Sequence, residues 1–192
     1  MKLQQTKKSI AIDMDGVLVD IETHFINWYE KEYGLKVSRE SLLGKPEGEA
    51  FPEKNAIKRF IFTKGFFRTA PVMEGAVQAV KALMEQYEVY VVSAAMEFPQ
   101  SLPEKRDWLY DHFPFIHWKN IIFCGDKSII DTDYMIDDHC KNLDHFKGMP
   151  IMFSAAHNAG ITRHTRVNSW AEVLGLFQLE QNAAARPAWP SW

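Results

Sequence analysis

The sequence predicts an α/β fold with a parallel sheet, flanking helices and a small helical cap inserted after the first strand. From about residue 70 onward, short apolar runs typical of buried strands alternate with stretches of helical spacing. Residues 20–69 contain helical spacing but no convincing strand. Alternating strands and helices favour parallel pairing with right-handed crossovers, so we expect a Rossmann-like core.

The first strand and the inserted segment are predicted from the N-terminal third of the chain. Residues 10–12 form a β-type run that stops at acidic residues and Gly16. Turn-forming residues then separate apolar residues at helical spacing, which predicts two to four helices. We therefore assign residues 1–19 and 70–180 to the α/β core and residues 20–69 to the cap.

The remaining core elements follow in alternation. Apolar residues at helical spacing predict a helix near 77–87, and the apolar run at 89–92 predicts the next strand. The later elements are a helix near 103–113, strands at 121–123, 134–136 and 150–153, and a last helix from about 170 to 179. Residues 181–192 are rich in Ala and Pro and lack periodicity, so we expect a disordered tail.

Composition narrows the class of protein. A hydrophobic share of 46% and a charged share of 24% are ordinary for a soluble enzyme, and the net charge of −3 gives no general attraction to nucleic acid or anionic membrane. The chain has no stretch near the roughly 18 apolar residues of a membrane helix. Its two cysteines have neither metal-ligand spacing nor the density of a disulfide scaffold. We expect a cytoplasmic protein with no nucleic-acid or membrane partner, either a monomer or a homodimer.

Asp13 and Asp15 follow the first predicted strand and are two residues apart, so both carboxylates can face one ligand. Two acids in one dry pocket would repel each other without a cation. Mg²⁺ fits this need because it binds carboxylate oxygens together with substrate phosphate. A carboxylate is also a competent nucleophile on phosphorus. The alternative is that this segment is only a polar turn.

Polar groups also follow three other predicted strands. Ser93 ends the strand at 89–92, where its hydroxyl can bind a phosphoryl oxygen, and Lys127 offers a positive charge for phosphoryl oxygens. Of Asp137 and Asp138, one could complete a metal shell and the other could bond to Lys127 or to water. Each group alone has a plain alternative as a solvated loop residue. Because the carboxyl ends of parallel strands meet at one edge, their order together predicts a site for phosphoryl transfer.

These motifs resemble those of the haloacid dehalogenase superfamily of phosphohydrolases. The segment from Asp13 to Leu18 looks like its first motif, Ser93 its second, Lys127 its third, and Asp137-Asp138 its fourth. Within the superfamily the likeness is closest to the 5′(3′)-deoxyribonucleotidases. The supporting segments are Asp13 to Asp20, Gly65-Phe66-Phe67 with Gly75-Ala76-Val77, and Glu104-Lys105 followed by Trp108. The resemblance spans roughly residues 9–175.

The resemblance implies a Mg²⁺-dependent phosphomonoesterase that hydrolyses deoxyribonucleoside monophosphates through an aspartyl-phosphate. Asp13 would attack phosphorus, and Asp15 would protonate the leaving alcohol and then activate water. The implied Mg²⁺ ligands are Asp13, the main-chain carbonyl of Asp15, and Asp137. The implied phosphate-binding groups are Ser93, Lys105 and Lys127. Asp138 would orient Lys127 or the waters on the metal.

The substrate is less well indicated than the reaction. The second motif reads Ser93-Ala94 where the nucleotidases commonly have Thr-Ser, and Ile21 stands where they often place an aromatic residue. Aromatic residues elsewhere could stack on a base instead, or could simply form the core of the cap. These residues are Phe25, Trp28, Phe51, Phe66 and Phe67.

Two alternatives therefore stay open. The first is a phosphatase for another small phosphate ester, such as a sugar phosphate, that uses the same residues. The second is a catalytically silent binding protein on the same fold. Because Asp13 and Asp15 are both present, the sequence favours an enzyme with a small phosphate ester as its partner.

Overall fold

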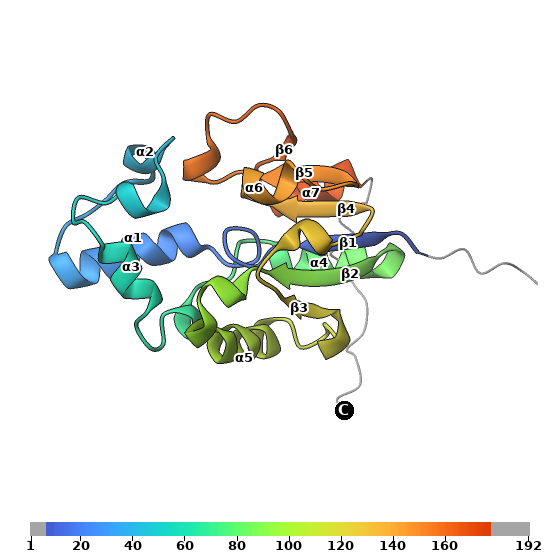
Figure 1. Ribbon diagram of the computed structural model, residues 1–192, viewed down its shortest axis with the longest axis horizontal. Helices are drawn as coiled ribbons and strands as arrows, with labels where there is room; N and C mark the ends of the chain where they lie inside the picture. The colour runs from blue at the N-terminus through green and yellow to red at the C-terminus, as the bar shows by residue number, and fades with distance from the viewer. Residues whose placement is uncertain (1–6, 178–192) are drawn as a thin grey trace, which may run out of the picture.

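A computed structural model describes residues 7–177, and a six-stranded parallel sheet lies at its centre (Figure 1). The strands are β1 (Ser9–Ile12), β2 (Glu88–Ser93), β3 (Ile121–Phe123), β4 (Tyr134–Asp137), β5 (Met149–Phe153) and β6 (Thr165–Val167). Their order in the sheet is β3-β2-β1-β4-β5-β6. Ile12 near the end of β1 is in register with Val91 on one side and Ile136 on the other. The loop after β1 therefore opens in the middle of the sheet edge.

The predicted α/β fold is confirmed, and each predicted strand is present. β6 was not predicted, because its three residues, Thr165, Arg166 and Val167, contain no apolar run. Three predicted parts extend beyond the described residues. They are the end of the core at 178–180, the end of the last helix at 178–179, and the tail at 181–192. No helix in the described part of the chain has the length and apolar character that crossing a bilayer requires.

The segment between β1 and the first core helix is helical, as predicted. It contains α1 (Ile21–Tyr33), α2 (Arg39–Leu42) and α3 (Ala56–Ile61), with the 3₁₀ helices η1 (Glu47–Glu49) and η2 (Phe67–Thr69). Figure 1 shows these helices at one end of the molecule, beyond the sheet edge that carries the β1 loop. The Asp20 side chain accepts a hydrogen bond from the Thr23 amide and caps α1, and Gly34 ends that helix with a φ of 67°.

The remaining helices flank the sheet. They are α4 (Ala76–Gln86), α5 (Leu102–His112), α6 (Cys140–Leu143) and α7 (Trp170–Leu176), with 3₁₀ helices η3 (Ala95–Glu97), η4 (Pro99–Ser101), η5 (Trp118–Asn120), η6 (Lys127–Ile129) and η7 (Ala156–Asn158). Two buried tryptophans tie α5 and α7 to segments near the sheet edge. The Trp108 indole donates to the Ala70 carbonyl at 2.7 Å, and the Trp170 indole donates to the Val17 carbonyl at 3.0 Å. Both contacts help to fix the loop after β1 and the exit from the inserted segment.

The two connections of the inserted segment run side by side. The Asp20 amide donates to the Pro71 carbonyl at 2.9 Å, and the Met73 amide donates to the Leu18 carbonyl at 2.8 Å. We refer to residues 20–69 as the cap segment, because their role as a separate cap stays a prediction.

Candidate active site

The loop after β1 presents Asp13 and Asp15 at the sheet edge. The Asp13 amide donates to the Ile136 carbonyl at 2.9 Å, which continues the pairing of β1 with β4. The loop then folds on itself, since the Leu18 amide donates to the Met14 carbonyl and the Gly16 amide to the Val19 carbonyl. Gly16 adopts a φ of 77°, a conformation that side-chain-bearing residues rarely tolerate. The Asp13 side chain is buried, whereas the Asp15 side chain is 29% exposed.

Gly16 is also required by its close packing against Asp138. A Cβ atom at position 16 would lie 2.1 Å from the Asp138 Oδ2 atom. Asp138 is itself fully enclosed, so its carboxylate has little room to move away. The glycine therefore lets the β1 loop and the β4 loop approach within contact distance.

We expect Gly16→Ala to abolish phosphatase activity and to destabilise the fold. The left-handed backbone alone costs about 1–2 kcal/mol for a residue with a side chain, and the clash displaces Asp138 as well. Thermal unfolding and phosphate release measure the two effects. Gly160→Ala is the matched control, because a Cβ there meets open space and needs no positive φ. Wild-type activity in Gly16→Ala would contradict the close packing described above.

Lys127 is held between two buried carboxylates. Its Nζ atom lies 2.5 Å from Asp13 Oδ1 and 2.6 Å from Asp137 Oδ2. Burial by itself would lower the pKa of Lys127, but the charges of Asp13 and Asp137 outweigh it and raise the pKa above its ordinary value. Burial also raises the pKa of Asp13 to about 7, although the Lys127 charge opposes that rise. The ammonium group is thus permanently charged beside the carboxylate that we predict to be the nucleophile.

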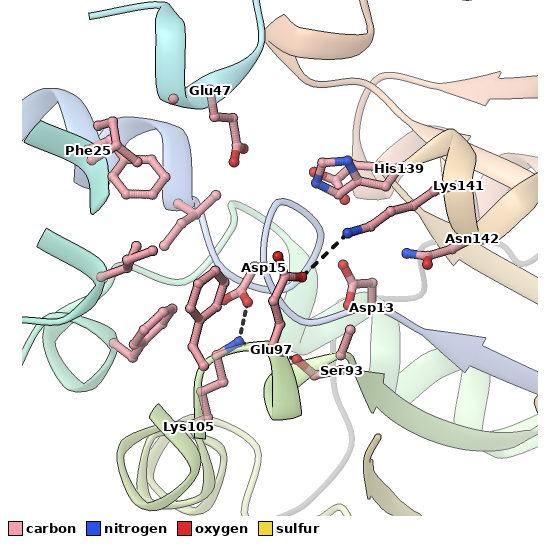
Figure 2. Close-up of a pocket in the computed structure, with 18 of the residues that line it drawn as sticks. Asp13, Asp15, Phe25, Glu47, Ser93, Glu97, Lys105, His139, Lys141 and Asn142 are labelled. Carbon is pink, nitrogen blue, oxygen red and sulfur yellow. Dashed lines mark hydrogen bonds and ion pairs between the residues drawn. The ribbon is translucent and has the colours of Figure 1, made fainter. Parts of the chain in front are cut away.

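Lys105 of α5 forms an ion pair with Asp15. Its buried ammonium group pairs with Asp15 Oδ2 and lies 3.3 Å from Ser93 Oγ (Figure 2). The same group lies 4.6 Å from the centroid of the Phe67 ring, at the end of the cap segment. Lys105, Asp15 and Ser93 therefore form a second polar group, which does not include Lys127.

The third set of groups could hold a metal ion. Carboxylate oxygens of Asp13, Asp137 and Asp138 lie within 4.8 Å of one another. The Asp137 oxygens are already occupied by Lys127, by the His139 amide at 2.8 Å and by the Asn142 side chain at 3.0 Å. The Asp138 Oδ1 atom is buried and has no hydrogen-bond partner, and burial raises the pKa of Asp138 well above its ordinary value.

Charge at the site also fits a divalent cation. Among the described residues, the four carboxylates of Asp13, Asp15, Asp137 and Asp138 form ion pairs with two lysines, Lys105 and Lys127. When all six groups are ionised, two negative charges remain in a buried region. A hard dication with oxygen ligands would neutralise them and occupy the free oxygen of Asp138.

A cavity of about 290 Å³ lies between these groups and the cap segment (Figure 2). Of the predicted aromatic contacts, Phe25 and Phe67 line it. The structure does not bring Trp28, Phe51 and Phe66 to the cavity. Phe66 is completely buried and packs against both Phe25 and Trp28, with ring centroids 5.2 and 5.1 Å apart. Trp28, Phe51 and Phe66 therefore belong to the core of the cap segment.

Sequence reasoning missed several residues that line the cavity. They are Ile57, Lys58 and Ile61 of α3, Glu47 of η1, Glu97 and Phe98 after β2, and His139, Lys141 and Asn142 after β4. Lys141 and Asn142 follow Asp137-Asp138 by about one helical turn, so a short helix after the fourth motif would have indicated them. The α3 residues had no such signal, because helical spacing alone does not say which face meets a ligand.

Comparison with known proteins agrees with this geometry. Residues 7–183 match the model of the family described as 5′ nucleotidase, deoxy (pyrimidine), cytosolic type C protein. The chain belongs to this nucleotidase family. It is 43% identical over 169 residues to a Staphylococcus aureus protein, covering 88% of this chain and 94% of that one. It is 41% identical over 170 residues to the 5′(3′)-deoxyribonucleotidase of Bacillus subtilis, covering 87% and 96%.

Solved structures show the fold of the wider superfamily. A haloacid dehalogenase family hydrolase from Deinococcus radiodurans, with bound phosphate and sodium, aligns with a TM-score of 0.60 at 13% identity. The alignment covers 90% of this chain and 96% of that structure. The predicted superfamily and family are thus confirmed, and the chain is a phosphatase of the nucleotidase class.

Proposed function

We propose that this nucleotidase hydrolyses deoxyribonucleoside monophosphates with Mg²⁺, through an aspartyl-phosphate on Asp13. The observation that carries the proposal is the arrangement around Asp13. Its carboxylate faces the cavity while a buried ammonium group fixes one of its oxygens at 2.5 Å. A fixed, partly neutralised carboxylate that faces a cavity beside buried ammonium groups is suited to attack on phosphorus.

Asp13, Asp138 and the main-chain carbonyl of Asp15 would hold the Mg²⁺ ion. The resemblance implies Asp137 as the ligand and Asp138 as the orienting group, and we propose the reverse. Both oxygens of Asp137 accept hydrogen bonds, from Lys127, the His139 amide and Asn142. Asp138, in contrast, has a buried oxygen without a hydrogen-bond partner. Bound there, the ion would supply positive charge for phosphoryl oxygens.

Ser93, Lys105 and Lys127 would bind the phosphoryl oxygens that do not face the metal. Lys105 Nζ lies 3.3 Å from Ser93 Oγ, Lys127 Nζ lies 2.5 Å from Asp13 Oδ1, and both lysines are almost fully buried. Buried donors of this kind stabilise developing charge better than solvated ones, because they need no reorganisation during the reaction.

Asp15 would act as the acid and then as the base. It is more exposed than Asp13 and lies where the leaving group would depart toward the cavity. Its Oδ1 atom has no partner, while Oδ2 is held by Lys105. The free oxygen would protonate the leaving alcohol, and after its departure would take a proton from the attacking water.

The cavity wall supports a nucleoside as the leaving group. Its apolar members Ile21, Phe25, Ile57, Ile61 and Phe67 provide a surface for a planar base, and relatives above 40% identity include a named 5′(3′)-deoxyribonucleotidase. The rival substrate class, sugar phosphates, needs hydroxyl-binding groups instead of such a wall.

Phosphate release from a panel of deoxyribonucleotides, ribonucleotides and sugar phosphates tests the substrate. We expect the highest kcat/KM with deoxyribonucleoside monophosphates. Ile57→Ser should raise KM for nucleotides more than for a small aryl phosphate, because only the nucleotide uses the apolar wall. A preference for sugar phosphates would contradict the proposed substrate and leave the phosphatase chemistry intact.

Magnesium should stabilise the fold more at high pH than at low pH. Burial raises the pKa of Asp13 to about 7, so the folded metal-free protein binds a proton that the unfolded chain releases above its lower pKa. The free energy of unfolding of the metal-free protein therefore falls as pH rises from the lower pKa of the unfolded chain to the folded pKa of about 7. Mg²⁺ binds the ionised carboxylates, so the rise in Tm that it causes should be larger at about pH 8 than at about pH 5.5. Calorimetry with and without Mg²⁺ measures this, and an equal gain at both pH values would contradict it.

A further inference from the structure

A second group of metal-ligating side chains lies between the cap segment and the core. Glu47 of η1 belongs to the cap segment, whereas Asp138, His139 and His157 belong to core loops. One ligand atom from each lies within 4.8 Å of the others. Two imidazoles with two carboxylates suit Zn²⁺ and similar transition-metal ions, unlike the all-oxygen set around Asp13. We propose that these four residues bind one such dication.

The first step in the argument is the tautomer of His157. Its Nε2 atom lies 3.0 Å from the Asp138 main-chain carbonyl oxygen. Because a carbonyl can only accept, Nε2 carries the proton and donates it. A metal-ligating histidine is neutral, so Nε2 would hold the single proton of the ring. The Nδ1 atom is then left with a free lone pair, and a backbone carbonyl on the other nitrogen is the usual arrangement for a metal-ligating histidine.

The second step is what this lone pair faces. His157 Nδ1 lies 3.7 Å from Glu47 Oε1. This distance is too long for a hydrogen bond, so the two side chains are not bonded directly to each other. Two donors on one tetrahedral zinc, with bonds of roughly 2.0–2.1 Å, lie about 3.3–3.4 Å apart. A cation between Glu47 and His157 would therefore need only a small adjustment of either side chain.

The other two residues complete the set. The His139 ring stacks on the His157 ring, with centroids 4.3 Å apart and planes at 19°, and one of its nitrogens lies within 4.8 Å of the other ligand atoms. Because stacked rings direct their lone pairs in parallel, the His139 ring would turn to point that nitrogen at the ion. Asp138 contributes a carboxylate that is 1% exposed, with its Oδ2 atom 3.8 Å from His157 Nε2. Figure 2 shows Glu47 and His139 extending into the same cavity from opposite sides. The ammonium group of Lys141, which also lines the cavity, bonds to Glu97 at 3.5 Å.

An ion at this position would join the cap segment to the core, because Glu47 is the only ligand from the cap segment among these four. It would also share Asp138 with the proposed Mg²⁺ site. We therefore expect Zn²⁺ to slow turnover by holding the cavity closed and by drawing on Asp138. This consequence depends on the proposed phosphatase mechanism, whereas the metal binding itself does not.

Calorimetric titration of the full chain with Zn²⁺ in excess Mg²⁺ tests the site, and the visible absorption of bound Co²⁺ reports the ligands. We expect the wild-type chain to bind one Zn²⁺ ion at these four residues. Glu47→Gln and His139→Asn should each weaken binding by at least the roughly 10–100-fold that loss of a supporting partner costs a metal site. His164→Asn is the control, because Cys140, Asp144 and His164 form a separate group of possible ligands.

The outcomes separate clearly. Binding that is lost in both test variants and kept in His164→Asn supports the proposal. No Zn²⁺ binding in excess Mg²⁺, or binding that both test variants retain, would overturn it. Thermal unfolding without transition metal checks that each variant is folded. Because binding is read directly, a failure of this site leaves the phosphatase proposal standing, and an inactive enzyme leaves this site testable.

Discussion

Replacing Asp13 with Asn is expected to reduce the turnover of deoxyribonucleotides by a factor on the order of 10⁴–10⁶, as the loss of a covalent nucleophile does elsewhere. The amide cannot form the phosphoenzyme, although it keeps nearly the same shape. Steady-state phosphate release measures the loss, and binding of a non-hydrolysed nucleotide analogue should persist because Lys105 and Lys127 remain.

The control for Asp13→Asn is Asp131→Asn, an exposed aspartate six positions before Asp137 in the same region of the chain. That change should leave the rate unaltered. Calorimetry should show that Asp13→Asn is folded, since Lys127 keeps its contact with Asp137 at 2.6 Å. An Asp13→Asn variant with near wild-type turnover would rule out attack by this carboxylate.

Replacing Asp15 with Asn is expected to slow nucleotide hydrolysis by roughly 10²–10⁴-fold, the usual worth of general acid catalysis. The effect should depend on the leaving group. An alkyl alcohol needs a proton in order to leave, whereas an acidic phenol does not. Formation of the phosphoenzyme from an aryl phosphate should therefore be much less impaired than formation from a nucleotide.

The second half of the reaction gives the sharper test of Asp15. Hydrolysis of the aspartyl-phosphate would lack its base, so the intermediate should accumulate and appear as a burst of phenol in rapid-quench measurements. Asp13→Asn should give no burst with either substrate. Equal, burst-free losses on both substrates in Asp15→Asn would show that Asp15 is not the acid–base group.

The sequence was most informative where strands end. Ser93 and Asp137 end β2 and β4, and Asp13 and Lys127 follow β1 and β3. These four strands are neighbours in the sheet, and parallel strands bring their carboxyl ends to one edge. Short apolar runs located those strands without any knowledge of the fold. The predicted meeting of these residues therefore depended on the strands being parallel, which the alternation of strands and helices predicts.

Details that depend on side-chain partners could not be predicted in this way. Asp137 and Asp138 are adjacent in sequence, and only the contacts of Asn142 and Lys127 distinguish the occupied carboxylate from the free one. The aromatic residues of the cap segment pose the same problem. Phe66 and Phe67 are neighbours, yet one is in the core and the other lines the cavity.

The group around Glu47 and His157 shows the limit most clearly. Glu47 comes from the cap segment and His157 from a loop after β5, and no motif links two residues so distant in the chain. Their approach results from the docking of the cap segment on the core. In that contact the Gly44 amide donates to the Ala156 carbonyl at 2.8 Å, and Glu22 accepts from the Ala156 amide at 2.9 Å.

Trapping the phosphoenzyme tests the central claim most directly. The Asp15→Asn variant is mixed with Mg²⁺ and an aryl phosphate, quenched in acid within the burst, and digested for peptide mass spectrometry. We predict a phosphoryl group on the peptide that contains Asp13, located at that residue by fragmentation and absent from the Asp13→Asn, Asp15→Asn double variant. A burst of phenol with no phosphoryl group on Asp13, or with the group on another residue, would contradict the proposed mechanism.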